Sequence, residues 1–261
     1  MIPISDSPAR RTRPWVTYAI IVVNVVVFVY LVTLSTAAPA APREFTRAMR
    51  DQADEVCYGL EVVPSEADRF LCKWAFQPKE FFDNLGGNSD VSRPDRPEIL
   101  LSIVTALFIH GGWLHILGNM LFLWVFGDNI EDRLGHLPYL LFYLVAGIVA
   151  SIVQGLVAPS SLTPVLGASG AVAGVLGAYL LFFPRATVRV VIPFFILILV
   201  PIPVPAALMI GLWFFQNLFS GFASVSQAVT PDQGTAWFAH IGGFAFGLLV
   251  ALAASVRGRR A

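Results

Sequence analysis

Residues 164–184 read PVLGASGAVAGVLGAYLLFFP, and this stretch predicts an apolar helix within a membrane. Apolar and small side chains fill it, and one hydroxyl, that of Ser169, lies among glycines and alanines. Small residues in an apolar helix allow neighbouring helix backbones to approach closely. Ser169 is therefore either a packing residue between close helices or a nucleophile below the surface of a membrane.

The composition of the whole chain is that of a polytopic membrane protein. Of its 261 residues, 56% are hydrophobic and 13% are charged, whereas soluble domains carry about 25% charge. The net charge is zero, so nothing indicates a nucleic-acid partner. No Cys/His spacing typical of a metal site is present. We therefore expect no metal, no cofactor and no nucleic acid.

Six segments are candidates for transmembrane helices, each of which needs about 20 apolar residues. The first is 14–36, which follows three arginines and also resembles a secretory signal peptide. It is longer than the 7–15 residues typical of a signal h-region, so we favour an uncleaved span. Prolines interrupt the apolar run 186–221, so residues 189–201 are expected to form a connection at the membrane interface. The other five predicted spans are roughly 113–128, 138–158, 168–183, 204–221 and 236–256.

The positions of the arginines predict the orientation of these spans, because short cytoplasmic loops are enriched in Lys and Arg. With the N-terminus inside, the inner segments hold nine arginines, and the short outer loops near 159–166 and 222–235 hold no Lys or Arg. The predicted organisation is a cytoplasmic tail (1–13), the first span (14–36), a long extracytoplasmic loop (37–98), five further spans (99–256) and a second cytoplasmic tail (257–261). The inner arginines are Arg10, Arg11, Arg13, Arg133, Arg185, Arg189, Arg257, Arg259 and Arg260.

Both cysteines, Cys57 and Cys72, lie in the long predicted outer loop. An oxidising compartment favours disulfides. We expect a structural disulfide between them, and the alternative is two free thiols.

Four polar side chains on three spans are predicted to lie at a similar depth. His115 and Asn119 are four residues apart on the second span, so they share one helix face. Ser169 lies in the first turn of the fourth span and His240 in the first turns of the sixth. All three spans enter from the outer side, so these groups meet in the outer part of the bilayer. Polar residues inside spans are hypotheses of function.

The four side chains supply the parts of a serine hydrolase. A serine needs a neighbouring base to become nucleophilic, and His240 can take that role. The oxyanion needs preorganised donors, for which the candidates are His115, Asn119 and the backbone N–H of Ser169. A triad also needs a carboxylate behind the histidine. The one acidic residue after Asp132 is in a loop, so the prediction is a Ser–His dyad.

Other interpretations of the same residues are open. Ser169 and Asn119 are also suited to packing between helices. We interpret His110 as structural and His136 as a loop residue. The sequence lacks the H-E-x-x-H pattern of zinc proteases, and FGD at 126–128 does not match the motif of intramembrane aspartyl proteases.

Three motifs resemble those of the rhomboid intramembrane serine proteases of bacterial type. They are HGGWLHILGNMLFLWVFGDNIEDRLG (110–135), GASG (167–170) and AHIGGFAFG (239–247), and they occur in the order and on the spans typical of that family. The likeness extends over residues 14–256, including LWFFQNLFSG (212–221) in the fifth span.

The resemblance implies an all-α, six-transmembrane-helix rhomboid core. It implies a Ser169 nucleophile, a His240 base and oxyanion stabilisation by His115 and Asn119. The implied activity is cleavage of transmembrane protein substrates near their outer ends, with the fifth span and the following loop as gate and cap. The short tails and the single six-span core favour a bacterial cell membrane as the location. The positions of the arginines predict that both termini are cytoplasmic and that the active site opens to the extracytoplasmic side. The alternative function is a catalytically silent rhomboid-like scaffold or chaperone.

The sequence departs from the family pattern at Ala173. Many members have an aromatic residue four positions after the nucleophile, where it packs on the catalytic histidine. We therefore expect His240 to be oriented differently, by a side chain from the second span.

Overall fold

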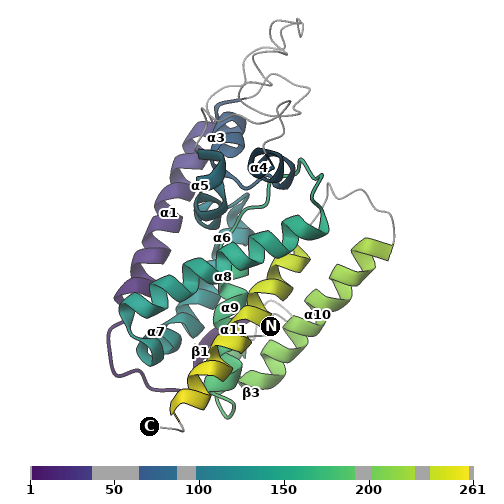
Figure 1. Ribbon diagram of the computed structural model, residues 1–261. Helices are drawn as coiled ribbons and strands as arrows, with labels where there is room; N and C mark the ends of the chain where they lie inside the picture. Colours follow the sequence, from purple (N-terminus) through teal and green to yellow (C-terminus); the bar gives the residue numbers. More distant parts are fainter. Residues whose placement is uncertain (1, 37–64, 87–97, 192–200, 227–235, 259–261) are drawn as a thin grey trace, which may run out of the picture.

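The computed structural model describes residues 2–36, 65–86, 98–191, 201–226 and 236–258, and these are mostly helical (Figure 1). The long helices are α1 (Trp15–Thr36), α8 (His136–Val157), α10 (Ala206–Ser226) and α11 (Trp237–Gly258). The shorter ones in the bundle are α5 (Glu98–Thr105), η1 (Ala106–Phe108), α6 (Trp113–Phe122), the π-helix η2 (Leu123–Gly127), α7 (Asp128–Leu134) and α9 (Ser169–Phe182).

Four of the described helices, α1, α8, α10 and α11, are long and apolar enough to cross a membrane individually. Two consecutive helical segments, Glu98–Phe108 and Trp113–Leu134, meet at a bend of 76°. Counted together as one broken span, they raise the number of spans in the described part of the chain to five. Helix α9 is apolar but has only 14 residues. The predicted helical membrane fold is confirmed, while the predicted number of six spans is not fixed by these lengths.

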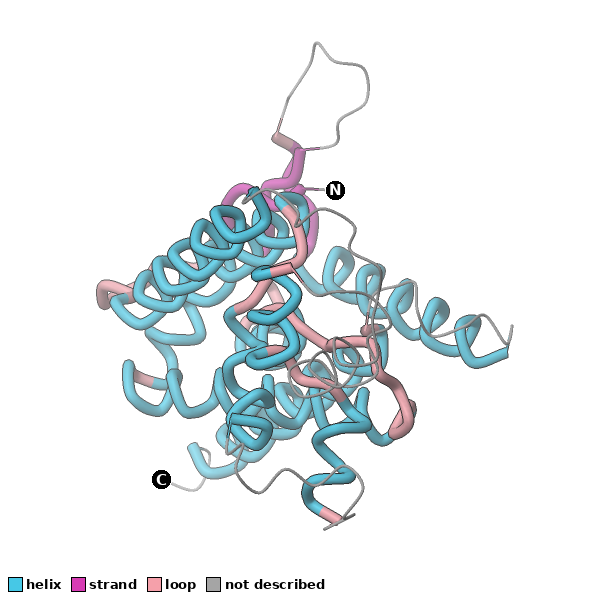
Figure 2. The backbone as a smooth tube through the Cα atoms, turned by 90° about the horizontal axis from the view of Figure 1, so that it is seen from above, coloured by secondary structure: helices cyan, strands magenta, loops and turns pink. Residues whose placement is uncertain are grey.

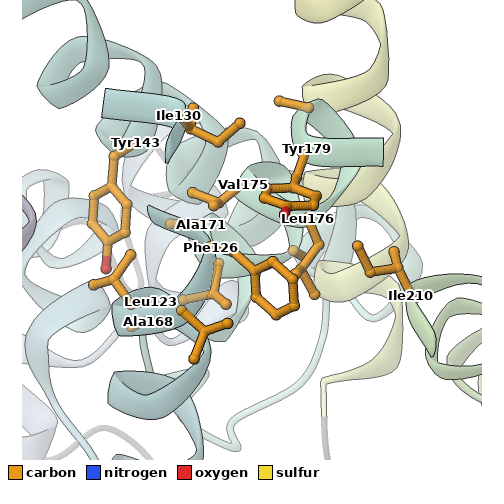
Figure 3. Close-up of a cluster of buried hydrophobic side chains, with 14 of the residues drawn as sticks. Leu123, Phe126, Ile130, Tyr143, Ala168, Ala171, Val175, Leu176, Tyr179 and Ile210 are labelled. Carbon is orange, nitrogen blue, oxygen red and sulfur yellow. The ribbon is translucent and has the colours of Figure 1, made fainter. Parts of the chain in front are cut away.

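Helix α9 forms the centre of the bundle. Every residue from Gly170 to Tyr179 is buried, because α8, α11 and the segment containing η2 surround the helix. Ala171 and Val175 pack in one buried cluster with Phe126, and Leu176 lies on the side of the cluster that faces Ile210 of α10 (Figure 3). Small residues on α9 allow this close enclosure.

A small antiparallel sheet closes one end of the molecule, and the sequence analysis did not predict it. Strand β1 (Ile2–Asp6) pairs with β2 (Thr187–Val191), which pairs with β3 (Ile202–Pro205). The strands lie together beside the N-terminus (Figure 2). Strand β3 runs directly into α10. The connection predicted at 189–201 therefore begins within β2 and ends directly before β3, and residues 192–200 lie outside the described residues.

The described part of the predicted outer loop contains two short helices, α3 (Glu66–Trp74) and α4 (Pro78–Leu85). A capping box formed by Ser65 and Asp68 begins α3. An isolated bridge between Phe76 and Val165 holds these helices against the segment before α9.

Cys72 lies on α3, and no free cysteine occurs among the described residues. Cys57 lies outside the described residues, so its pairing with Cys72 remains a prediction.

Glu131 fastens α7 to the beginning of α1. Its buried carboxylate accepts hydrogen bonds from the backbone N–H groups of Val16 (2.9 Å) and Thr17 (2.8 Å), and from the Thr17 hydroxyl (2.7 Å). His136, at the start of α8, also contacts this carboxylate. A negative charge at a helix N-terminus satisfies donors that have no partner within the helix.

Candidate active site

Helices α9 and α11 are in backbone contact at the level of Ser169 and His240. A Cβ atom built on Gly243 would lie 2.0 Å from the carbonyl oxygen of Gly170. One built on Gly170 would lie 3.8 Å from the carbonyl oxygen of Ala239. The two helices therefore meet along a glycine seam that begins next to Ser169 and His240, and at Gly243 the opposite helix leaves no room for a side chain.

The turn before α9 brings His115 and Asn119 towards Ser169. Gly167 has a φ of +116°, which L side chains rarely adopt. A Cβ at this position would lie 2.6 Å from His115 Nε2 and 3.8 Å from Asn119 Nδ2. The two side chains of α6 thus lie against the backbone two residues before Ser169.

His110 holds this arrangement in place from the segment before α6. Its Nε2 lies 3.0 Å from Asn119 Nδ2 and accepts a 3.4 Å hydrogen bond from the backbone N–H of Ala168. Its ring centroid is 5.0 Å from that of His115. The interpretation of His110 as structural agrees with these contacts, which join α6 to the turn at Gly167.

His240 is oriented by α10, and the expectation that the second span provides this side chain is wrong. Its Nδ1 lies 2.5 Å from Oδ1 of Asn217. The Trp213 ring lies 5.7 Å from the imidazole at a tilt of 36°, and the Trp237 ring lies 6.2 Å away and edge-on. Trp213 thus makes an aromatic contact with His240, which the methyl side chain of Ala173 cannot make.

The structure brings the predicted residues to one region from three helices: His115 and Asn119 from α6, Ser169 from α9 and His240 from α11. Ser169 is half-buried, whereas Asn119 and His240 are buried. Asn217 and Trp213 were not predicted to belong to the site. A signal for Asn217 existed, because a polar residue within a span is a hypothesis of function.

Chemically, this region offers a hydroxyl, imidazole nitrogens, an amide and the N-terminus of α9. Within the described ranges, no group of three or more His, Cys, Asp or Glu side chains is placed to hold a metal ion. The arrangement suits acyl transfer, which needs a nucleophile, a base and oxyanion donors.

Comparison with known proteins finds similarity to rhomboid proteins over much of the chain. The Rhomboid domain family model matches residues 97–257, which is more than half of the sequence. RHOMBOID-like protein 4 of Arabidopsis thaliana is 28% identical over 260 residues, covering 95% of this chain and 54% of that protein. RHOMBOID-like protein 1 of the same plant is 28% identical over 182 residues, covering 66% of this chain and 41% of the relative.

A bacterial relative matches over a shorter part. Rhomboid protease GluP of Bacillus subtilis (strain 168) is 41% identical over 78 residues, covering 30% of this chain and 15% of that protein. The chain spans about half or less of the length of these relatives. Because they come from plants and a bacterium, the bacterial type remains a prediction. The extent of the family match and the shared helical membrane fold establish that this chain belongs to the rhomboid family.

Proposed function

We propose that the chain is an intramembrane serine endopeptidase. The observation that carries the proposal is the glycine seam between α9 and α11, which holds the beginnings of the two helices in contact next to Ser169 and His240. A hydroxyl and an imidazole on separate helices need such close backbones to reach hydrogen-bond distance. The family membership and the relative named a rhomboid protease support the same reaction.

In the proposed reaction, Ser169 Oγ attacks the carbonyl carbon of a peptide bond and its proton passes to His240. The oxyanion is stabilised by Asn119, His115 and the backbone N–H of Ser169. When the C–N bond breaks, His240 gives the proton to the leaving nitrogen. Water then attacks the ester, with His240 as base, and releases the new carboxyl end and the free serine.

The substrates in this proposal are transmembrane segments, cleaved near their outer ends. Helix α9 has 14 residues and rises about 21 Å, less than the ~30 Å of a bilayer core. Ser169 begins α9, so it lies below one membrane surface when the other end of α9 reaches the opposite surface. A substrate helix must unwind there, because its backbone hydrogen bonds otherwise protect the peptide bond.

The proposed orientation has both termini in the cytoplasm and the active site open to the extracytoplasmic side. In Figure 1, α1 begins and α11 ends at the lower end of the molecule, and α3 to α5 lie at the upper end. This arrangement supports two termini on one side. The proposed location is a bacterial cell membrane, and the relatives also include proteins named mitochondrial and chloroplastic.

Replacement of Ser169 by alanine tests the proposal. The purified protein in liposomes is incubated with a single-span reporter helix, and the products are identified by mass spectrometry. Cleavage by the natural sequence and none by Ser169→Ala is the expected result. The control is Ser220→Ala on α10, which removes another half-buried hydroxyl and is expected to cleave like the natural sequence.

Labelling by a fluorophosphonate separates the enzyme from the alternative, a catalytically silent scaffold. The probe forms a covalent bond with an activated serine oxygen, so labelling at Ser169 is expected for the enzyme. A folded protein that neither labels nor cleaves would instead be the scaffold.

A further inference from the structure

We propose that Asn217 is a positioning residue for catalysis, which fixes the His240 ring with its proton on Nδ1 and leaves Nε2 free as the base. This inference rests on the proposed function and extends its dyad to a Ser169–His240–Asn217 triad. The third member comes from α10, a helix to which the sequence analysis assigned no part of the chemistry.

The orientation of the Asn217 amide is fixed by its own helix. Its Nδ2 donates a 2.7 Å hydrogen bond to the backbone carbonyl oxygen of Trp213, one helical turn earlier. A carbonyl accepts only, so the nitrogen of the amide must lie on that side. The amide oxygen is therefore the atom directed at His240, in agreement with the 2.5 Å contact.

The tautomer of His240 follows from the orientation of this amide. An amide oxygen has lone pairs and no proton, so the imidazole nitrogen beside it must carry the hydrogen. In a neutral imidazole the other nitrogen is then the acceptor. Nε2 of His240 thus has the lone pair that a base needs to take the Ser169 proton. The backbone carbonyl of Trp213 fixes the amide, and the amide fixes the imidazole.

Both members of this pair are buried. Asn217 is 3% exposed and His240 is 7% exposed, so water competes weakly for their hydrogen bond. The ring of Trp213 lies beside the imidazole at 5.7 Å between centroids, which restricts rotation about the side-chain bonds of His240. The titratable side chain of His115, on α6, lies near this pair. Asn217 remains neutral, so it orients the base without adding a negative charge.

When His240 accepts the serine proton, both of its nitrogens become donors, and the Asn217 oxygen is then bonded to a charged ring. Hydrogen bonds to charged groups contribute more than neutral ones. Replacement of Asn217 by leucine is therefore expected to lower the maximal rate about 10- to 100-fold, with little effect on substrate binding.

The closing experiment compares Asn217→Leu and Asn217→Asp with a matched control, Asn24→Leu. Asn24 on α1 is also buried and also donates from Nδ2 to the carbonyl one turn earlier, that of Ile20, at 2.7 Å. The control therefore measures the loss of a similar buried asparagine away from His240. All variants contain the same 261 residues, in detergent micelles, and their thermal unfolding is recorded.

The first readout is the ¹⁵N NMR spectrum of histidine-labelled protein. The chain has four histidines, so single His→Gln variants assign the resonances. The natural sequence and Asn24→Leu are expected to show a protonated Nδ1 and an unprotonated Nε2 in His240. Asn217→Leu is expected to lose this preference. An unchanged tautomer in folded Asn217→Leu overturns the proposal.

The second readout is the rate of fluorophosphonate labelling at saturating probe, as a function of pH. Asn217→Leu is expected to label 10- to 100-fold more slowly, with its acid limb at lower pH, because the protonated ring has lost an acceptor. Asn217→Asp is expected to stay within tenfold of the natural rate, with its acid limb at higher pH. Labelling of Asn217→Leu within twofold of the natural sequence, or equal acid limbs in the two variants, also overturns the proposal. A natural sequence that never labels counts against the proposed protease, and the NMR tautomer still decides the role of Asn217.

Discussion

Replacement of Gly243 by alanine tests the central geometry of the molecule. The new methyl carbon would lie 2.0 Å from the carbonyl oxygen of Gly170. Ordinary contact begins at 3.4 Å, so α9 and α11 must separate by roughly 1.4 Å. The clash is with backbone, so no side-chain rotation relieves it.

Two effects of different size are expected from this displacement. Overpacking in a close-packed region costs about 1–3 kcal/mol of folding free energy. A misplacement of about 1 Å between reacting groups lowers a rate on the order of 100-fold. Activity is therefore expected to fall more steeply than stability, because Ser169 and His240 are on the two helices that separate.

The assay follows fluorophosphonate labelling and thermal unfolding of the same preparation. Gly211→Ala on α10 is the control, because a Cβ there meets nothing within 4 Å and is expected to leave both measurements unchanged. If Gly243→Ala labels as fast as the natural sequence and unfolds at the same temperature, the two helices are not in backbone contact and the reasoning fails.

Two further predictions concern the end of the molecule that holds the sheet. Glu131→Ala removes the acceptor of two backbone donors of α1 and is expected to lower the free energy of unfolding by on the order of 3 kcal/mol. Glu131→Gln should lose less stability. An unfolding temperature that is unchanged in both variants would contradict the role of Glu131 at the start of α1. Burial raises the pKa of Asp6 from 3.8 to about 6, although a hydrogen bond from Tyr179 opposes the shift. Because this pKa is raised in the folded state, the protonated carboxyl contributes to the free energy of unfolding at low pH. This contribution is lost as the pH rises from about 4 to about 6. The unfolding temperature of Asp6→Asn relative to the natural sequence should therefore increase over this range and then level off, and a difference independent of pH would refute the assignment.

The helices and the four polar residues were predictable because their signals are local. Apolar runs identify spans, and the spacing of His115 and Asn119 places them on one face of a helix. The order of the three motifs, together with alternating topology, predicts that Ser169 and His240 enter the membrane from the same side. None of these steps requires knowledge of how the helices cross.

The role of α10 was not predictable in this way. Gln216 and Asn217 are adjacent polar residues in one apolar helix, and only the packing of α10 on α11 decides which of them reaches His240. The stacking of Phe214 on Phe244, at 4.2 Å, fixes that rotation. The rotation of α10 depends on its contacts with α11, so it cannot be predicted from the sequence of either helix alone.

The sheet could not be predicted for a similar reason. Strand β1 is five residues long and pairs with a segment more than 180 residues later. Short polar and apolar residues near a terminus give no periodic signal strong enough to distinguish a strand from a tail. The pairing becomes evident only when the bundle brings the two segments to the same end.

The glycines along α9 and α11 also restrict how any molecule can approach the serine. Built Cβ atoms on Gly177 and Gly247 lie 2.2 Å and 1.9 Å from carbonyl oxygens of the opposite helix, so no acyl chain or peptide fits between these two helices. A polypeptide bound for Ser169 has to arrive across another flank of the bundle. An inhibitor that is to reach this hydroxyl should accordingly be designed for those flanks, and widening the α9–α11 junction should impair the protein rather than open a new entrance.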